Sequence, residues 1–263
     1  MKIHKINQQT VFKSSFRQYT PKANKDFKHY GKMIIKTYSK TLREDIDLRD
    51  LLRYAVPHFK DVPVVNTYSL ACSDLSEAYS YKIAVMEEVP KELQSKFSNV
   101  FASDIDKRIL AAARSGRINI FSSEFAEALR LYGYDLTKYF KDKKVSVMVQ
   151  GDDISESDTI SSYEPIKELK EKLIIKRSDI LTELKNIKDN GNSIVMSRNA
   201  LPYTSDDYID EVIYTANRNL KKGSLFAIGE FDNQAIELYK KLLAKDFFCP
   251  LSGKNNNIVF EHI

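Results

Sequence analysis

The chain has 263 residues, of which 43% are hydrophobic, and its formal net charge is +5. This length suits one sizeable α/β domain with a small extension. No window approaches the ~18–20 continuous apolar residues of a membrane span. The amino-terminal residues lack a signal-peptide apolar stretch, and the two cysteines give neither a disulfide framework nor a metal-ligand spacing. We therefore expect a cytoplasmic protein without a metal site.

The positive charge is concentrated at the amino-terminal end. Residues 1–44 carry eleven Lys and Arg against two acids, a net charge of +9, so the remainder carries −4. A basic segment of this kind attracts an acidic partner, such as an acidic protein face, nucleic acid or lipid headgroups. The alternative is a solvated arm without a partner. Among partners we expect a protein that serves as acceptor or presents an acidic face, and we do not expect nucleic acid.

Residues 1–61 are predicted to form a basic arm and a short helical extension. Residues 1–30 lack clear periodicity, whereas the apolar spacing between Tyr30 and Phe59 is typical of two short helices. Pro57 closes the second of them. We expect these helices to pack on the main domain, which we place at residues 62–263.

The main domain begins with a strand, a turn, a helix, a second strand and an acid. A strand is predicted at 64–71, a helix at 76–88 and a second strand at 99–104, which ends in Asp104. A helix that starts directly after a strand presents backbone N–H groups and a positive dipole end to a ligand in the turn. An acid at the tip of the next strand can accept hydrogen bonds from both hydroxyls of a ribose. This unit predicts a nucleoside pocket at the carboxyl edge of a parallel sheet, unless Asp104 merely caps a helix.

The rest of the chain continues the alternation of strands and helices. After a helix at 107–115, residues 117–172 are less regular, and we interpret them as an insertion with a helical piece at 121–140, a strand-like run at 145–149 and a polar loop at 151–162. Further strands are predicted at 173–176, 193–196 and 224–229, helices after 179 and at 205–220 and 233–244, and a final hairpin from 247–248 and 258–260. The predicted fold class is α/β, a Rossmann-like doubly wound, mostly parallel sheet with a C-terminal antiparallel hairpin.

Four segments of this domain together resemble a known family. The loop S-A-x-C-S-T-G-E-E-P-Y-S is matched by residues 69–80, and the motif A-T/S-D-I-D-x-x-x-L-x-x-A-x-x-G by residues 102–116. The signature C-R-N-V-x-x-Y is matched by 197–203, and L-K-P-G-G-x-L-x-x-G-x-x-E by 220–230. These segments are similar to class I S-adenosylmethionine-dependent methyltransferases, most closely the CheR type, which methylates chemoreceptor glutamates. The resemblance implies S-adenosylmethionine as cofactor.

The resemblance also implies a role for individual residues. Asp104 would hold the ribose hydroxyls, Glu77 would face the amino group of the methionine part, and Asp179 would lie near the adenine. Arg198 and Tyr203 would lie near the acceptor as catalytic residues, against the alternatives of a surface ion pair and a half-buried packing residue. The full set of cofactor-binding candidates is Ala71, Ser73, Asp74, Glu77, Asp104, Ile105, Asp179, Ile180, Asn199 and Ala200.

The sequence departs from the family pattern in three places. Leu75 stands where the loop has its last glycine, which lets the backbone approach the ligand and tolerates positive φ. Leucine is expected to fit poorly there if the donor packs as usual. Ala78 replaces a proline, and the N-x-T-x-F-F-R segment of the CheR type is not recognisable in residues 1–61.

These features leave three functional hypotheses. The first is an active methyltransferase acting on a protein carboxylate or similar acceptor, since an activated methyl group needs no strong base. The second is a methyltransferase-fold protein that has lost activity and serves as a binding module. The third is an amino-methyltransferase with N/D-P-P-Y after its fourth strand, but Asn199 to Tyr203 has one residue too many.

Overall fold

The computed structural model describes residues 41–43, 46–149, 158–188, 191–201, 204–229, 235–252 and 258–263. In chain order the elements are α2 (Leu48–His58), β1 (Asn66–Leu70), α3 (Ser76–Glu88), η2 (Gln94–Phe97), β2 (Asn99–Asp104), α4 (Lys107–Arg114), β3 (Ile118–Phe121), α5 (Ser122–Tyr132), η3 (Leu136–Lys138), β4 (Phe140–Val149), β5 (Asp158–Pro165), α6 (Lys167–Lys170), β6 (Leu173–Arg177), α7 (Ile180–Asn186), β7 (Ser193–Ser197), α8 (Asp206–Asn219), β8 (Leu225–Ile228), α9 (Ala235–Leu243), β9 (Phe247–Phe248) and β10 (Val259–His262). The predicted helix at 76–88 and strand at 99–104 are confirmed.

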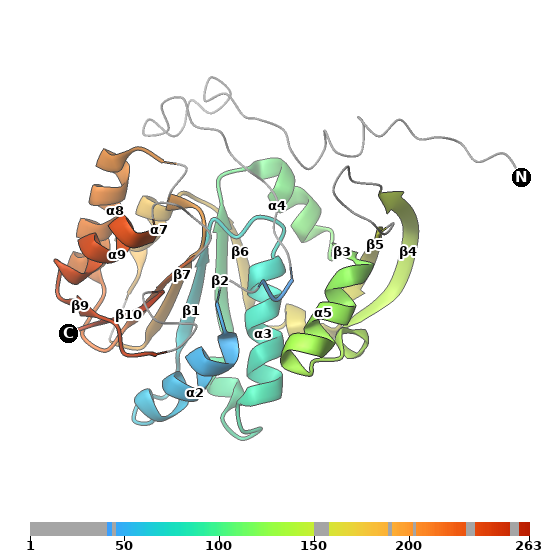
Figure 1. The fold of residues 1–263 in the computed structure, drawn as a ribbon, viewed down its shortest axis with the longest axis horizontal. Helices are drawn as coiled ribbons and strands as arrows, with labels where there is room; N and C mark the ends of the chain where they lie inside the picture. Colours follow the sequence, from blue (N-terminus) through green and yellow to red (C-terminus); the bar gives the residue numbers. More distant parts are fainter. Residues whose placement is uncertain are drawn as a thin grey trace, which may run out of the picture.

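The main sheet has seven strands in the order β6-β2-β1-β7-β8-β10-β9 (Figure 1). Strand β1 pairs in parallel with β2 and β7, and β10 runs antiparallel to β8 and β9. The predicted fold class is therefore confirmed. The chain order along the sheet reverses between β1 and β7, and in open α/β sheets ligands bind outside the carboxyl ends of the strands at such a point. The loops after β1, β2 and β7 meet there.

Helices cover both faces of this sheet. Helices α2, α3 and α4 contribute to one apolar core, and α7, α8 and α9 contribute to the other. Side chains of β1 alternate between the two faces, as the pleat requires. Tyr68 and Leu70 belong to the core under α7 to α9, and the alternating positions Thr67 and Ser69 are buried polar residues. Strand β1 therefore brings a hydroxyl, on Ser69, to the α3 side of the sheet.

A second, antiparallel sheet lies beside the main one, in the order β3-β5-β4 with α5 packed against it (Figure 1). It corresponds to the predicted insertion, but its details differ from the prediction. Helix α5 ends at Tyr132, because Gly133 adopts a left-handed conformation with φ of 74° that caps the helix. Strand β5 occupies the second half of the predicted polar loop. Most of its residues are polar, and pairing with β3 and β4 holds them in a strand.

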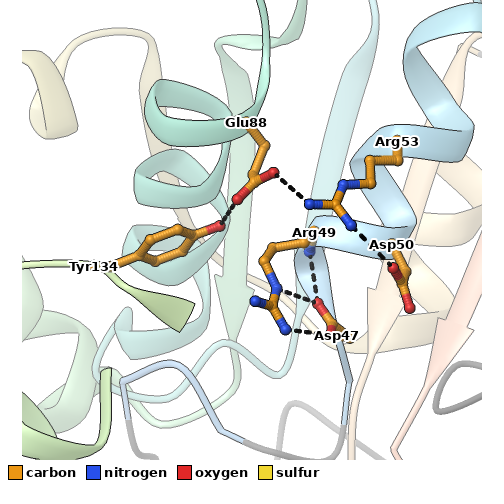
Figure 2. Close-up of polar contacts among 6 residues, drawn as sticks. All are labelled: Asp47, Arg49, Asp50, Arg53, Glu88 and Tyr134. Carbon is orange, nitrogen blue, oxygen red and sulfur yellow. Dashed lines mark hydrogen bonds and ion pairs between the residues drawn. The ribbon is translucent and has the colours of Figure 1, made fainter. Parts of the chain in front are cut away.

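Ion pairs and hydrogen bonds fasten α2 and the inserted sheet to the end of α3, as Figure 2 shows. Asp47 caps α2 by accepting from the backbone N–H of Arg49 at 3.0 Å. Arg53 of α2 approaches Glu88 of α3 at 3.5 Å, and the Tyr134 hydroxyl donates to the other oxygen of Glu88 at 2.8 Å. Glu88 thus joins three parts of the chain, so the inserted sheet is anchored to the helix that follows the first strand.

Among the residues that the structure describes, no helix combines the length and apolar character that crossing a bilayer requires.

Candidate functional site

The turn between β1 and α3 carries three non-glycine residues in the left-handed region. The φ angles are 57° at Ala71, 52° at Ser73 and 75° at Leu75. Each such conformation costs about 1–2 kcal/mol for a residue with a side chain. The turn is held by hydrogen bonds from Cys72 N to Ser103 O at 2.8 Å and from Leu75 N to Cys72 O at 3.1 Å. Backbone strain of this kind gathers at ligand-binding sites, where the surrounding structure holds it in place.

Leu75 takes the backbone conformation that a glycine would take at the same position. Leu75 is the N-cap residue of α3, and its side chain is fully buried in the core formed with α2, α3 and α4. The leucine side chain therefore does not lie on the surface of the loop, where a poor fit with the donor was expected. The side chain counts among the apolar core residues, and the strain is carried by the backbone.

Asp104 at the tip of β2 links its strand to the β1–α3 turn. One carboxylate oxygen accepts from Ser73 N at 2.9 Å and the other from Asp106 N at 2.8 Å. Burial raises the pKa of Asp104, and these two N–H groups oppose the rise. Asp104 does not cap a helix, because the N-cap of α4 is Asp106, which accepts from Arg108 N at 2.9 Å. Each carboxylate oxygen of Asp104 has the capacity for a second hydrogen bond, such as one from a ribose hydroxyl.

Asp74 lies at the start of α3 and is held by Ser76. Its Oδ1 accepts from the Ser76 backbone N–H at 3.0 Å and from the Ser76 hydroxyl at 2.7 Å. Burial raises the pKa of Asp74 to about 6, the Ser76 hydrogen bonds lower it, and the charge of Asp104 adds to the rise. The sequence did not single out Ser76. Its position two residues after an acid in a turn is the pattern of a local hydrogen-bonded motif.

Glu77 and Arg198 form a buried ion pair between α3 and the end of β7. Glu77 Oε2 lies 3.4 Å from Arg198 Nε, and Glu77 Oε1 accepts from the Ser69 hydroxyl at 2.6 Å. Because the Arg198 side chain is only 2% exposed, the alternative of a surface ion pair is wrong. The structure thus brings together two residues that the sequence assigned to different ends of the reaction. Ser69 is a further member that the sequence analysis missed.

The position of Asn199, next to Arg198, requires a glycine at Gly229, just after the carboxyl end of β8. Asn199 has a left-handed φ of 55°. A Cβ added at Gly229 would lie 1.9 Å from Asn199 Oδ1 and 2.8 Å from Asn199 N, far inside contact distance. Only glycine therefore fits at 229 with Asn199 in this position. Gly229 lies in the fourth matched segment, residues 220–230, so the sequence motif already marked this position.

The remaining predicted residues lie near the same edge of the sheet or outside the described chain. Asp179 caps α7 by accepting from Thr182 N and from the Thr182 hydroxyl, both at 2.8 Å. Ile180 is buried in the core under α7 to α9, and Ile105 and Ala200 are half-buried in the loops after β2 and β7. Tyr203 lies outside the described residues.

The sequence matches the family described as CheR methyltransferase, SAM binding domain, over residues 37–242. The chain belongs to the CheR methyltransferase family. The matched range runs from before α2 to within α9, so it takes in the whole turn after β1 and the inserted sheet. No curated protein matches the sequence.

Several solved structures resemble this CheR domain weakly. Precorrin-6y C5,15-methyltransferase from Geobacter metallireducens has 9% identity and a TM-score of 0.38, with 79% of this chain and 77% of that chain covered. Precorrin 8w decarboxylase of Methanobacterium thermoautotrophicum has 13% identity and a TM-score of 0.40, with 81% and 76% covered. The glycopeptide N-methyltransferase MtfA complexed with sinefungin has 10% identity and a TM-score of 0.36, with 78% and 62% covered. The family assignment does not depend on these similarities.

The cofactor of a CheR domain is S-adenosylmethionine, and the residues present fit its adenosyl group. Asp104 is fixed by two backbone N–H groups and retains acceptor capacity for hydroxyls. The side chain of Leu75 packs in the core. The departure from the family loop is thus compatible with the cofactor.

Proposed function

We propose that this chain is an active methyltransferase whose donor is held between the turn after β1, the tip of β2 and the end of β7, and whose acceptor is a carboxylate of a protein. The observation that carries the proposal is the bond from Ser73 N to Asp104. It joins the strained turn and the ribose-binding acid into one unit, which is what an adenosyl group requires. Asp104 would hold the ribose, and Glu77 would lie toward the methionine part.

A carboxylate acceptor agrees with the side chains at this edge. When bound, S-adenosylmethionine supplies an activated methyl group, and a carboxylate accepts it without first losing a proton. Cys72 is not suited to act as a base or nucleophile, because burial and the charges of Asp104 and Glu77 raise the pKa of its thiol well above the usual range. His58 is held elsewhere, with Nε2 at 2.7 Å from the carbonyl of Gly223 before β8. Neither residue is therefore placed to take a proton from the acceptor, which agrees with positioning as the main contribution to the reaction.

The acceptor class can be tested by the chemistry of the product. The purified chain is incubated with donor carrying a tritiated methyl group and with protein extract, and the labelled product is treated with mild alkali. A methyl ester on a carboxylate releases volatile methanol under these conditions, whereas an N-methyl group does not. We expect label in protein that alkali releases. Alkali-stable label, or label in nucleic acid, would instead support the amino-methyltransferase hypothesis.

The basic segment at residues 1–44 offers a way to recruit the acceptor. Its net charge of +9 would attract an acidic protein face through long-range electrostatics. Such attraction is screened by salt. The rate of methyl transfer to the acceptor should therefore fall as ionic strength rises. The affinity for S-adenosylhomocysteine should change less.

A further inference from the structure

Glu124 is a buried carboxylate whose contacts reach far along the chain. It lies in the first turn of α5, its residue is 2% exposed, and Oε2 accepts from Thr41 N at 2.7 Å. Its other oxygen accepts from Phe121 N, the residue that precedes its own helix, at 3.1 Å. A carboxylate buried among apolar residues is costly unless such donors satisfy it. Glu124 therefore fastens Thr41, in the segment before α2, to α5, the helix that packs against the inserted sheet.

The residue after Thr41 continues this connection to α3. Leu42 N donates to the Ser80 hydroxyl at 2.7 Å, and that hydroxyl donates to Ser76 O at 2.6 Å. The Ser76 hydroxyl in turn donates to Asp74 Oδ1 at 2.7 Å. Thr41 and Leu42 are both buried, and Figure 1 shows α5 beside α3. A hydrogen-bonded path thus leads from Glu124, through residues 41–42, to the turn after β1.

We propose that Glu124 is a positioning residue for donor binding, acting through residues 41–42, Ser80 and Ser76 on the turn that contains Asp74. The inference rests on the donor site proposed above. Glu124 does not touch that turn. It holds the segment whose Leu42 N–H donates to the Ser80 hydroxyl, and Ser80 and Ser76 then fix the first turn of α3. Loosening this fastening should lower donor affinity without removing any group that contacts the donor.

The test uses the full chain with Glu124→Gln and Ser80→Ala, and with Glu127→Gln as a matched control on the same helix. Glutamine keeps the size of Glu124 but turns an acceptor into a donor, so one buried N–H loses its partner. We expect Glu124→Gln and Ser80→Ala each to weaken binding of S-adenosylhomocysteine about tenfold in titration calorimetry, the effect of about one hydrogen bond. Glu127→Gln should bind as the wild type does.

Amide hydrogen exchange of the ligand-free chain separates a local effect on the turn from a general loss of stability when exchange at residues 74–76 is compared with exchange in the buried strand β7. Exchange at residues 74–76 should quicken in Glu124→Gln and Ser80→Ala but not in Glu127→Gln. Unchanged affinity together with unchanged exchange at 74–76, even with a lower melting temperature, would overturn the inference. If the wild type itself fails to bind S-adenosylhomocysteine, the proposed function fails. Exchange then decides the link between Glu124 and the turn on its own. Faster exchange at residues 74–76 in the two variants would support that link, and unchanged exchange would overturn it.

Discussion

Leu75 combines a left-handed φ of 75° with a fully buried side chain. The left-handed backbone costs about 1–2 kcal/mol for leucine and almost nothing for glycine. The buried side chain contributes more than this, because removing a buried leucine typically costs about 2–5 kcal/mol. The balance explains how leucine is accommodated where the family loop has glycine.

Two substitutions at Leu75 separate these terms. Leu75→Ala loses the side chain and keeps the strained backbone, whereas Leu75→Gly loses the side chain and relieves the strain. We expect both variants to be less stable than the wild type, and Leu75→Gly to be more stable than Leu75→Ala by about 1 kcal/mol. Denaturant unfolding measures both. A glycine variant that is more stable than the wild type would show that the leucine side chain is not well packed.

Gly229 is required by its distance to Asn199. Gly229→Ala should displace Asn199, because the added Cβ would lie 1.9 Å from Asn199 Oδ1. We expect affinity for S-adenosylhomocysteine to fall at least tenfold in titration calorimetry, since a contact this short moves the loop after β7. Gly116→Ala is the control: its φ of +76° brings backbone strain, but no atom lies within 4 Å of the added Cβ. Equal affinity of the two variants would remove Asn199 from the site.

At the scale of elements, the contacts of Glu88 decide how firmly the inserted sheet is attached. Tyr134→Phe removes the hydroxyl that donates to Glu88 at 2.8 Å and should lower the free energy of unfolding by about 1 kcal/mol. Arg53→Ala breaks an ion pair whose arginine side chain is 65% exposed, so it should cost less than about 0.5 kcal/mol. Denaturant unfolding of the two variants compares these losses. A larger loss for Arg53→Ala would show that the attachment of α2 to α3 contributes more to stability than the attachment of the inserted sheet through Tyr134.

The sequence predicted those elements in which apolar residues form a clear run. Helix α3 holds a group of apolar residues that Pro90 follows, and β2 holds the apolar run Val100-Phe101-Ala102; both were placed at their observed bounds. Strand β5 was missed because its residues Thr159, Ser161 and Ser162 are polar, and only pairing with β3 and β4 gives them a strand conformation.

The same limit applies to the site. Asp104 was found because a strand and a turn precede it in the chain. The pairing of Glu77 with Arg198, and the contact of Glu124 with Thr41, join residues far apart in sequence. Periodicity carries no information about such contacts, because they depend on how the elements pack. The burial of Leu75 likewise depends on how the elements pack, so the sequence pattern could not predict it.

For the whole molecule, buried carboxylates set the dependence of stability on pH. Burial raises the pKa of Glu124 from an ordinary value of 4.5 to about 7, against the opposing hydrogen bonds of Phe121 and Thr41. Between these two values the folded protein binds the proton more tightly than the unfolded chain does. The contribution of Glu124 to stability is therefore fully present below pH 4.5 and is lost as pH rises toward 7.

This contribution can be isolated by comparison with Glu124→Gln, which does not titrate. The free energy of unfolding of the wild type minus that of Glu124→Gln should increase by a few kcal/mol between pH 8 and pH 5. Urea unfolding at the two pH values measures the difference. A difference that decreases on acidification would mean that Glu124 is stabilised as the charged form.

The central claim is that the turn after β1 and the tip of β2 bind S-adenosylmethionine despite Leu75. Titration calorimetry with S-adenosylhomocysteine tests it on the wild type, on Asp104→Asn and on Asp106→Asn. Asparagine keeps the size of Asp104, because Asp104→Ala would leave the N–H groups of Ser73 and Asp106 buried without an acceptor and cost stability as well. Asp106→Asn controls for a helix-capping loss nearby. We predict binding by the wild type and by Asp106→Asn and at least tenfold weaker binding by Asp104→Asn. No heat from the wild type at millimolar ligand, or unchanged affinity of Asp104→Asn, would contradict the claim and favour a binding module that retains only the methyltransferase fold.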